Sequence, residues 1–355
     1  MFKSDDEMKV AILVESWGEP WNEGYKNLAK YIVEAISNFI DVKVFPADRI
    51  KISLLKDFDL IHVFNYDIPY HLLPYFIAIR RPIIKHIAKY EIKNNAVSSI
   101  ILDFLKTKYV YDAFIVTMEI LKRELGEVVR NKPLFFLPPP VPIDYCGDID
   151  KSNARELLGL QHNCIYIGYA GAINKYKRLD MLFNAIRRVK AEFENKISLI
   201  ISPSHIYPPK YYTKIRRTLV ENKGLYKFLR VNDMRLFYKA IDVLIYPSEY
   251  LGSIAPPLVL LEAMSCGTLV IAKRNIITST IIENGLNGFL FANTEELIEI
   301  IKSILRGTID VESISLRERR YINMNYNPSI VYKKYIEVYK QVLTLFHEQG
   351  ESNVE

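Results

Sequence analysis

Short apolar runs alternate with segments of helical periodicity along most of the chain. Lys9–Val14 and Ala113–Val116 have the length and composition of buried strands, whereas Leu28, Ile32 and Ile36 recur at helical spacing. Strands that alternate with helices are typical of parallel sheets covered on both faces, so we expect an α/β fold. The other expected strands are residues 42–45, 59–64, 81–87, 134–137, 164–169, 197–201, 227–231, 242–246 and 268–272, and the other expected helices are 68–80, 119–129, 179–189, 210–222, 233–240, 278–283, 295–305 and a helix around Glu262.

A proline-rich segment interrupts this alternation. Leu137–Pro142 contains four prolines and cannot form a helix, so we interpret it as a stiff, extended linker. The alternation restarts behind it, which predicts one domain at residues 1–142 and a second at 143–328. Two doubly wound, Rossmann-like domains would face each other across a cleft and bind ligands at the carboxyl ends of their strands. Residues 329–355 are predicted to form a long amphipathic helix and a tail, with apolar side chains at Ile330, Val331, Tyr335, Val338, Val342 and Phe346.

The composition is typical of a soluble globular protein. Of the 355 residues, 50% are apolar and 12% are aromatic, which suffices for full hydrophobic cores. No apolar run reaches the roughly 18 residues of a membrane span, and Met1–Glu7 is too polar for a signal peptide, so we expect a cytoplasmic protein. The three cysteines, Cys146, Cys164 and Cys266, lack metal-ligand spacing and are too few for a disulfide framework. We therefore expect reduced thiols and no metal site.

The net charge of +6 is unevenly distributed. Residues 1–150 hold 19 basic against 21 acidic residues, a net charge of −2, and the remainder holds 28 against 20, a net charge of +8. A basic second half suits an anionic ligand such as a nucleotide diphosphate, although a solvated lysine-rich surface has the same composition. No dense arginine run or nucleic-acid motif accompanies the charge, so a nucleic-acid partner is not expected.

A single carboxylate stands out in the most apolar stretch of the chain. Between Leu251 and Ala272 the only charged residue is Glu262. Burial of a carboxylate inside an apolar helix costs several kcal/mol of stability, or the group becomes protonated and loses its charge, unless it is hydrogen-bonded. A ligand with hydroxyl groups would satisfy it, and so would a buried lysine or arginine of the core.

The residues around Glu262 resemble the donor-binding signature of family-four glycosyltransferases with the GT-B fold. The resemblance covers about residues 8–345 and is specific in the second half of the chain. It implies a GT-B architecture whose C-terminal helix returns to the first domain. The matching segments, in their order along the chain, are Tyr246–Ser248, Pro257–Gly267, Val270–Ala272 and Ile282–Leu290.

The resemblance implies a hexosyl-type glycosyltransferase. Such an enzyme transfers a sugar from a nucleotide-sugar donor, with UDP or GDP as the leaving group, and retains the anomeric configuration. The acceptor is a glycan, a lipid-linked molecule or a protein, held mainly by the first domain. The nucleotide sugar is a substrate, and neither a cofactor nor a metal ion is expected.

The resemblance also assigns donor-binding residues. Glu262 would bind the ribose hydroxyls, because a diol satisfies a carboxylate with two hydrogen bonds. Lys177 and Arg178 would neutralise the leaving diphosphate, although a solvated lysine-rich turn is the alternative for them and for the neighbouring Lys175. A helix that begins at Pro257 would offer unpaired amides to the donor. The remaining expected donor-binding residues are Gly171, Val231, Leu258 and Val259.

Two positions depart from the family pattern. Ile254 stands where the family carries a glutamate that contacts the donor sugar, and Ala172 stands where it carries an arginine. Glu249 lies five residues before Ile254, and we hypothesise that its carboxylate reaches the same space and takes a catalytic role, with a surface or capping role as the alternative. The departures also motivate a second function class, a catalytically silent GT-B protein that binds a nucleotide sugar or glycan.

The first domain offers weaker candidates. Gly24 stands where relatives carry a glycine-rich loop, and His86 where they place a histidine beside the donor sugar; a plain turn and a structural histidine are the alternatives. His62 lies in mid-strand and is predicted to be a core residue. The segment Leu72–Arg81 is a candidate for peripheral contact with an anionic membrane, against a buried helix with a basic end. Aromatic candidates for acceptor stacking are Trp17, Trp21, Tyr66 and Tyr70.

Overall fold

The chain folds into two compact units. The computed structural model describes residues 8–18, 24–46, 50–64, 68–88, 110–126, 129, 131–193, 196–206, 216–249 and 255–352. The first unit comprises residues 1–140, 253–255 and 326–355, and the second comprises residues 141–252 and 256–325. The chain passes between them at Pro140 and Val141, inside the proline-rich segment and next to the expected boundary at residue 142.

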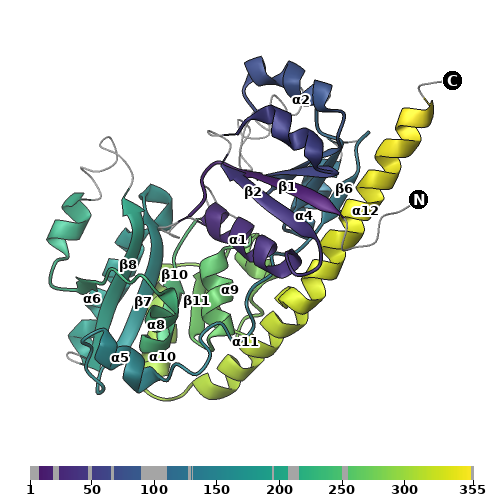
Figure 1. The fold of residues 1–355 in the computed structure, drawn as a ribbon. Coiled ribbons are helices and arrows are strands. Elements are labelled where there is room, and N and C mark those ends of the chain that lie inside the picture. The colour runs from purple at the N-terminus through teal and green to yellow at the C-terminus, as the bar shows by residue number, and fades with distance from the viewer. Residues whose placement is uncertain are drawn as a thin grey trace. The chain divides into compact units, whose positions relative to one another are not determined.

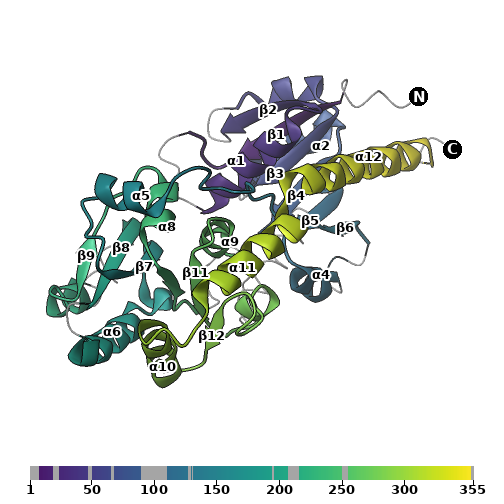
Figure 2. The ribbon, with the colours of Figure 1, turned by 90° about the horizontal axis from the view of Figure 1, so that it is seen from below.

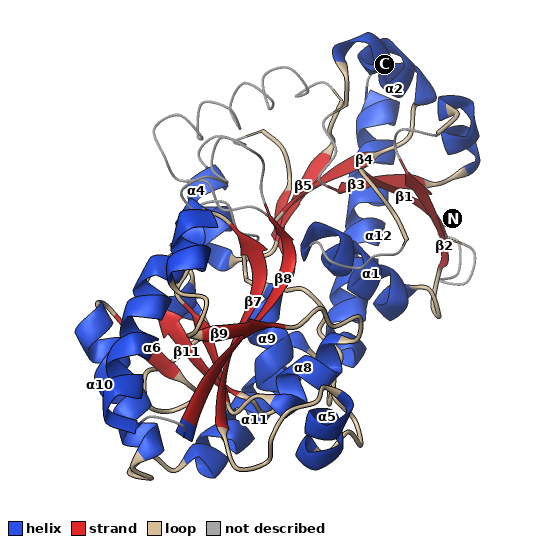
Figure 3. Ribbon diagram, turned by 90° about the vertical axis from the view of Figure 1, so that its left-hand side faces the viewer, coloured by secondary structure: helices blue, strands red, loops and turns tan. Residues whose placement is uncertain are grey.

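The first unit is built on a parallel sheet of six strands. The chain adds strands outward from β1 in both directions, in the order β2-β1-β3-β4-β5-β6, which Figure 3 shows in red. Val10 of β1 lies in register with Val42 of β2 and Leu60 of β3. The central strands are buried on both faces, which explains their unbroken apolar runs. The strands are β1 (Lys9–Val14), β2 (Asp41–Pro46), β3 (Leu60–Phe64), β4 (Ile83–Ile87), β5 (Ala113–Val116) and β6 (Leu134–Phe136).

The C-terminal helix α12 (Pro328–Ser352) belongs to the first unit and packs against α1 (Gly24–Ile36) (Figure 1). Its buried side carries Val331, Tyr335, Val338 and Val342, as expected, and also Tyr339, whereas Ile330 is 45% exposed. Among the described residues, no helix combines the length and the apolar composition that a membrane crossing requires. The other helical segments of this unit are η2 (Ile52–Asp57), η3 (Tyr70–Leu72), α2 (Leu73–Ile79) and α4 (Glu119–Gly126).

The second unit has its own six-stranded parallel sheet, in the order β12-β11-β10-β7-β8-β9. Helices α6 (Leu179–Phe193) and α10 (Thr294–Leu305) cover one face, and α5 (Lys151–Leu157) and α8 (Met234–Ala240) lie on the other (Figure 2). Both sheets are therefore doubly wound, as predicted. The strands are β7 (Ile165–Ile173), β8 (Ile197–Ile206), β9 (Tyr226–Phe228), β10 (Val243–Tyr246), β11 (Leu269–Lys273) and β12 (Phe289–Phe291), and the remaining helices are η4 (Lys175–Lys177), α9 (Leu258–Ser265), η6 (Thr278–Thr280) and α11 (Val311–Tyr326).

Several predicted elements differ from the structure in extent. The helix expected at residues 278–283 is only the short turn η6, and the strand expected at 227–231 ends at Phe228. Of the helix expected at 210–222, residues 216–221 are helical and residues 210–215 lie outside the described part. Helices α5 and α11 and strand β12 were not predicted.

Candidate functional site

Three neighbouring strands of the second unit end beside a cluster of charged side chains. Strands β11, β10 and β7 are adjacent and parallel, so their carboxyl ends lie along one edge of the sheet. Lys177 and Arg178 follow β7, Glu249 follows β10, and Lys273 is the last residue of β11. The carboxyl edge of a doubly wound sheet is the usual ligand-binding edge, which makes this cluster the first candidate.

Glu249 is ion-paired with residues from both flanking strands. Nη1 of Arg178 donates to Oε1 of Glu249 at 3.1 Å, and Nζ of Lys273 lies 3.6 Å from the same oxygen. Arg178 also donates to both carboxylate oxygens of Asp180, and these bonds, followed by those to Glu249, raise the pKa of the guanidinium. The carboxylate proposed for catalysis is thus held between two cations.

Lys177 points at the neighbouring strand. It ends η4, is 8% exposed, and its Nζ donates to the Tyr246 hydroxyl at 3.3 Å while lying 5.1 Å from the centre of that ring. Asn174 caps η4 by accepting the amide hydrogen of Tyr176 at 2.9 Å. The alternative of a solvated lysine therefore does not describe Lys177, whereas Lys175 is exposed, with its Nζ 4.8 Å from the centre of the Tyr176 ring.

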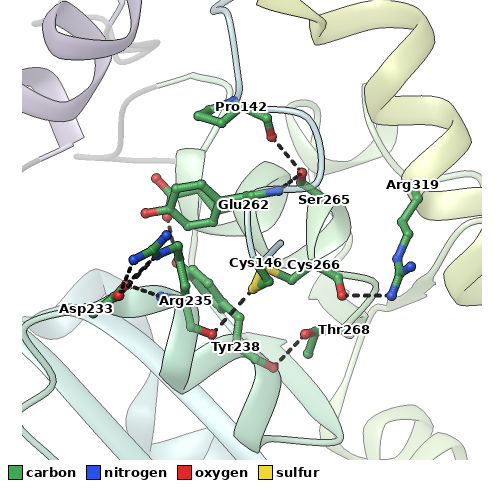
Figure 4. The surroundings of a disulfide bond; sticks show 11 residues. Pro142, Cys146, Asp233, Arg235, Tyr238, Glu262, Ser265, Cys266, Thr268 and Arg319 are labelled. Carbon is green, nitrogen blue, oxygen red and sulfur yellow. Dashed lines mark hydrogen bonds and ion pairs between the residues drawn. A yellow bond between two sulfur atoms is a disulfide. The ribbon is translucent and has the colours of Figure 1, made fainter. Parts of the chain in front are cut away.

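Glu262 is buried in α9, at 4% exposure, among apolar neighbours. The Tyr238 hydroxyl donates to its Oε2 at 2.7 Å (Figure 4). Burial, with the nearby carboxylate, raises the pKa of Tyr238 well above its ordinary value, so the phenol stays a donor. The expected need for a hydrogen-bond donor is confirmed, and a tyrosine of α8 supplies one.

A disulfide joins Cys146 to Cys266, immediately after α9 (Figure 4). The expectation of reduced thiols is wrong for this pair, and only Cys164 is a free cysteine among the described residues. The two cysteines are 120 residues apart in sequence, so spacing gave no sign of a bond that the fold creates at a Cα–Cα distance of 5.1 Å. Ser265 adds a second link, since its hydroxyl donates to the Pro142 carbonyl at 2.7 Å.

The start of α9 differs by one position from the prediction. Pro257 is the residue before the helix, and Leu258 is its first residue. By the geometry of any helix, the amides of Leu258 and Val259 have no intrahelical acceptor, and their binding to the donor stays a prediction. Ile254 lies outside the described residues.

Two further predicted residues lie elsewhere in the second unit. Gly171 falls inside β7, at a register shift, with φ of 123°, and a Cβ there would meet no atom within 4 Å. A backbone of that conformation with open space beside it suits close approach by a ligand. Val231 is part of the loop between β9 and α8.

Two histidines of the first unit, His62 and His86, form a buried chain with the C-terminal helix. Nδ1 of His62 lies 2.8 Å from the Tyr339 hydroxyl, and Nε2 of His62 lies 3.1 Å from Nδ1 of His86. Burial lowers the pKa of His86 to about 3, and burial together with His86 lowers that of His62. Nε2 of His86 has no hydrogen-bond partner among the described residues. The interpretation of His62 as a core residue is confirmed, and His86 is bonded to it.

The remaining candidates of the first unit are dispersed. Gly24 is the exposed first residue of α1, Trp17 is half-buried, and Tyr70 belongs to η3. Trp21 and Tyr66 lie outside the described residues. In the part of the chain that the structure describes, no three His, Cys, Asp or Glu side chains gather as metal ligands would.

Sequence reasoning missed Lys273, Tyr238 and Tyr246 as partners of the predicted site residues. Lys273 directly follows the predicted apolar strand 268–272, and the rule that ligands bind at carboxyl strand ends would have selected it. Tyr246 belongs to a segment that matches the donor-binding signature, but Tyr238 offered no signal among the 24 tyrosines of the chain.

Residues 164–307 match the family of glycosyl transferases group 1. That segment contains every charged residue of the cluster together with Glu262. The second unit therefore carries a glycosyl transferases group 1 domain.

Curated relatives match this chain over part of its length. A D-inositol 3-phosphate glycosyltransferase of Catenulispora acidiphila is 31% identical over 166 residues, which are 43% of this chain and 38% of that protein. A lipopolysaccharide 1,2-N-acetylglucosaminetransferase of Salmonella typhimurium is 24% identical over 225 residues, 59% of this chain and 55% of that protein. The chain thus spans less than two thirds of the length of the curated relatives it matches.

Solved structures extend the likeness beyond the group 1 domain to the fold of both units. Anabaena HepE in complex with UDP and glucose matches with a TM-score of 0.76 at 16% identity, over 94% of this chain and 99% of that one. Sucrose-phosphate synthase from Thermosynechococcus elongatus matches with a TM-score of 0.71 at 16% identity, over 95% and 100%. The predicted GT-B fold is confirmed.

Proposed function

We propose that the chain is a glycosyltransferase that moves a hexosyl group from a nucleotide-sugar donor to a hydroxyl acceptor. The observation that carries the proposal is the content of the segment that matches glycosyl transferases group 1. It holds a buried carboxylate, Glu262, and three cationic side chains at the carboxyl edge of its sheet. A nucleotide diphosphate presents the groups that these residues bind, ribose hydroxyls and phosphate oxygens.

The proposed donor is a UDP-sugar. HepE, which shares the fold, is described in complexes with UDP and with UDP-glucose. Lys177 and Arg178 would stabilise the charge that develops on the leaving diphosphate, with preorganised cations in place of a metal ion. The reaction is therefore expected to continue in the presence of EDTA. Retention of the anomeric configuration is expected from the resemblance to family-four glycosyltransferases.

The proposed acceptor is a glycan, a lipid-linked molecule or a protein. The relatives named above act, by their names, on an inositol phosphate and on lipopolysaccharide. Helix α2 supports peripheral membrane contact, because Tyr75 and Ile77 are 61% and 55% exposed and Arg80 directly follows the helix. Co-sedimentation with vesicles of anionic and of neutral lipid, using wild type and Tyr75→Ser/Ile77→Ser, tests that contact.

A catalytically silent nucleotide-sugar-binding protein is the second candidate. It is favoured by Ala172 and Ile254 in place of the family's charged residues and by the engagement of Glu249 in ion pairs. This protein would bind the same donor without releasing UDP from it.

The test is UDP release from UDP-glucose and UDP-N-acetylglucosamine, with and without EDTA and candidate acceptors. Lys177→Met should lower the rate at least about tenfold, whereas Lys196→Met should not change it, because exposed Lys196 lies at the amino end of β8. Donor binding without UDP release would favour the silent protein. Absence of binding to any nucleotide sugar would refute both proposals.

A further inference from the structure

The carboxylate of Glu249 occupies a position that two cations define. Oε1 receives a hydrogen bond of 3.1 Å from Arg178 and lies 3.6 Å from Nζ of Lys273. Arg178 follows β7 and Lys273 ends β11, while Glu249 follows the strand between them. Two cations converge on one oxygen at the ligand-binding edge of the sheet.

Two hydrogen bonds to main-chain carbonyl groups hold this arrangement in place. The amide of Glu249 donates to the Tyr176 carbonyl at 2.8 Å, which ties the loop after β10 to the turn after β7. On the other side, Nδ2 of Asn275 donates to the carbonyl of Ser248 at 3.2 Å, and Ser248 is fully buried. The backbone thus brings the Glu249 side chain between the cations, so the contact is not an accidental meeting of long surface side chains.

The ion pairs are exchangeable. The side chains of Arg178 and Glu249 are 34% and 33% exposed, and that of Lys273 is 16% exposed. Ion pairs with this access to water are typically worth no more than about 1 kcal/mol. A ligand with several anionic oxygens and more than one negative charge interacts more strongly with the same arginine and lysine.

We propose that Arg178 and Lys273 form an anion subsite of the donor site, and that Glu249 occupies it until an anionic oxygen of the donor displaces the carboxylate. This inference rests on the proposed function, because it presupposes a nucleotide-sugar donor. It makes Lys273 a donor-binding residue and Glu249 a competitor that lowers donor affinity. The anionic oxygens belong either to the diphosphate or to the carboxylate of a uronic acid sugar.

Calorimetric titration of the full chain measures the competition. Glu249→Gln should bind UDP about threefold to tenfold more tightly than wild type, and Lys273→Met should bind it about threefold to tenfold less tightly. Uridine, which has no phosphate, should bind all three proteins equally. Glu192→Gln is the matched control, because Glu192 is also held by one lysine and one arginine, Lys302 and Arg306, and should leave UDP affinity unchanged.

The donor series identifies the source of the anionic oxygen. Equal gains for UDP and UDP-glucose in Glu249→Gln assign the subsite to the diphosphate, whereas a gain confined to UDP-glucuronate assigns it to the sugar carboxylate. A catalytic role for Glu249 predicts a slower transfer rate in Glu249→Gln with no gain in affinity, and that result overturns the inference.

Thermal unfolding of each variant checks that it is folded. If Glu249→Gln does not fold, Lys273→Met alone tests the subsite. The subsite alone is refuted if wild type binds UDP, but neither UDP nor UDP-glucuronate binds Lys273→Met more weakly or Glu249→Gln more tightly than wild type. Wild type that binds none of the nucleotides refutes the proposed function itself.

Discussion

The hydroxyl of Tyr238 donates a hydrogen bond of 2.7 Å to Oε2 of Glu262, and both side chains are buried in the second unit. The bond fixes the carboxylate from α8 and compensates part of its desolvation. A neighbouring disulfide, Cys146–Cys266, fixes the end of the same helix (Figure 4). The candidate ribose ligand is therefore held rigidly before any donor arrives, which lowers the entropy lost on binding.

Removal of the disulfide should destabilise the second unit. The bond closes a loop of 120 residues, and cross-links of that span typically contribute about 2–5 kcal/mol through the unfolded chain. Cys146→Ser and Cys266→Ser should each lower the melting temperature of this unit in calorimetry, and reduction of wild type should have the same effect. Cys164→Ser is the control, since Cys164 is a free cysteine. Equal melting temperatures for all four proteins would show that the bond does not form.

Acid should destabilise the first unit through its histidine pair. His62 and His86 contact each other, Tyr335 and Tyr339 of α12, and Phe64 of β3. Their pKa values are lowered in the folded state, that of His86 to about 3, so the unfolded chain binds more protons below its histidine pKa of about 6.5. Stability is thus complete above about pH 6.5 and falls as the pH drops, by about 2 kcal/mol at pH 5 for His86, with a further loss in the same direction from His62.

Tryptophan fluorescence follows this loss, because the chain has two tryptophans, Trp17 and Trp21, and Trp17 belongs to the first unit. Denaturant unfolding at pH 7, 6 and 5 gives the slope of the free energy of unfolding against pH. The double variant His62→Gln/His86→Gln should flatten this slope, and His162→Gln should leave it unchanged. A wild-type slope no steeper than that of the double variant would contradict the neutral, buried pair.

Substitution of Gly168 should disturb the packing of β7 on α8. A Cβ at Gly168 would overlap Cδ1 of Ile241 and lie 3.0 Å from Cζ of Phe237, and both side chains are buried. We expect Gly168→Ala to cost about 1–3 kcal/mol in denaturant unfolding. Ile241→Val removes the overlapping methyl group, so the double variant should recover part of the loss. A double variant less stable than both single variants would contradict this account.

The fold was predictable from the sequence where all the side chains that face the core are apolar. Strands β1 and β5 have their predicted bounds, because buried parallel strands are continuous apolar runs. Helix α11 was not predicted because its buried stripe, Ile314, Glu318 and Ile322, has a carboxyl group at its centre. Glu318 accepts the amide hydrogen of Val270 at 3.0 Å, and burial raises its pKa well above the ordinary value.

Single residues of the site were predictable from the sequence, but the contacts between them were not. Lys177 and Arg178 were selected from the resemblance, Glu262 as the lone charge of an apolar run, and Glu249 from its position five residues before Ile254. The structure places all four in the second unit. Which of them meet depends on strand order, which the sequence pattern does not contain. The order β11-β10-β7 brings Lys273 to Glu249, and the packing of α8 beside α9 brings Tyr238 to Glu262.

The central claim is that Glu262 binds the ribose hydroxyls of a nucleotide diphosphate. Calorimetric titration of wild type and Glu262→Gln with UDP and with 2′,3′-dideoxy-UDP tests it directly. Wild type should bind UDP about tenfold to a hundredfold more tightly than the dideoxy compound, since hydrogen bonds to a charged group contribute about 1.5–3 kcal/mol. Glu262→Gln should lose most of that difference. An equal difference in both proteins, or a wild type that binds neither nucleotide, would contradict the claim.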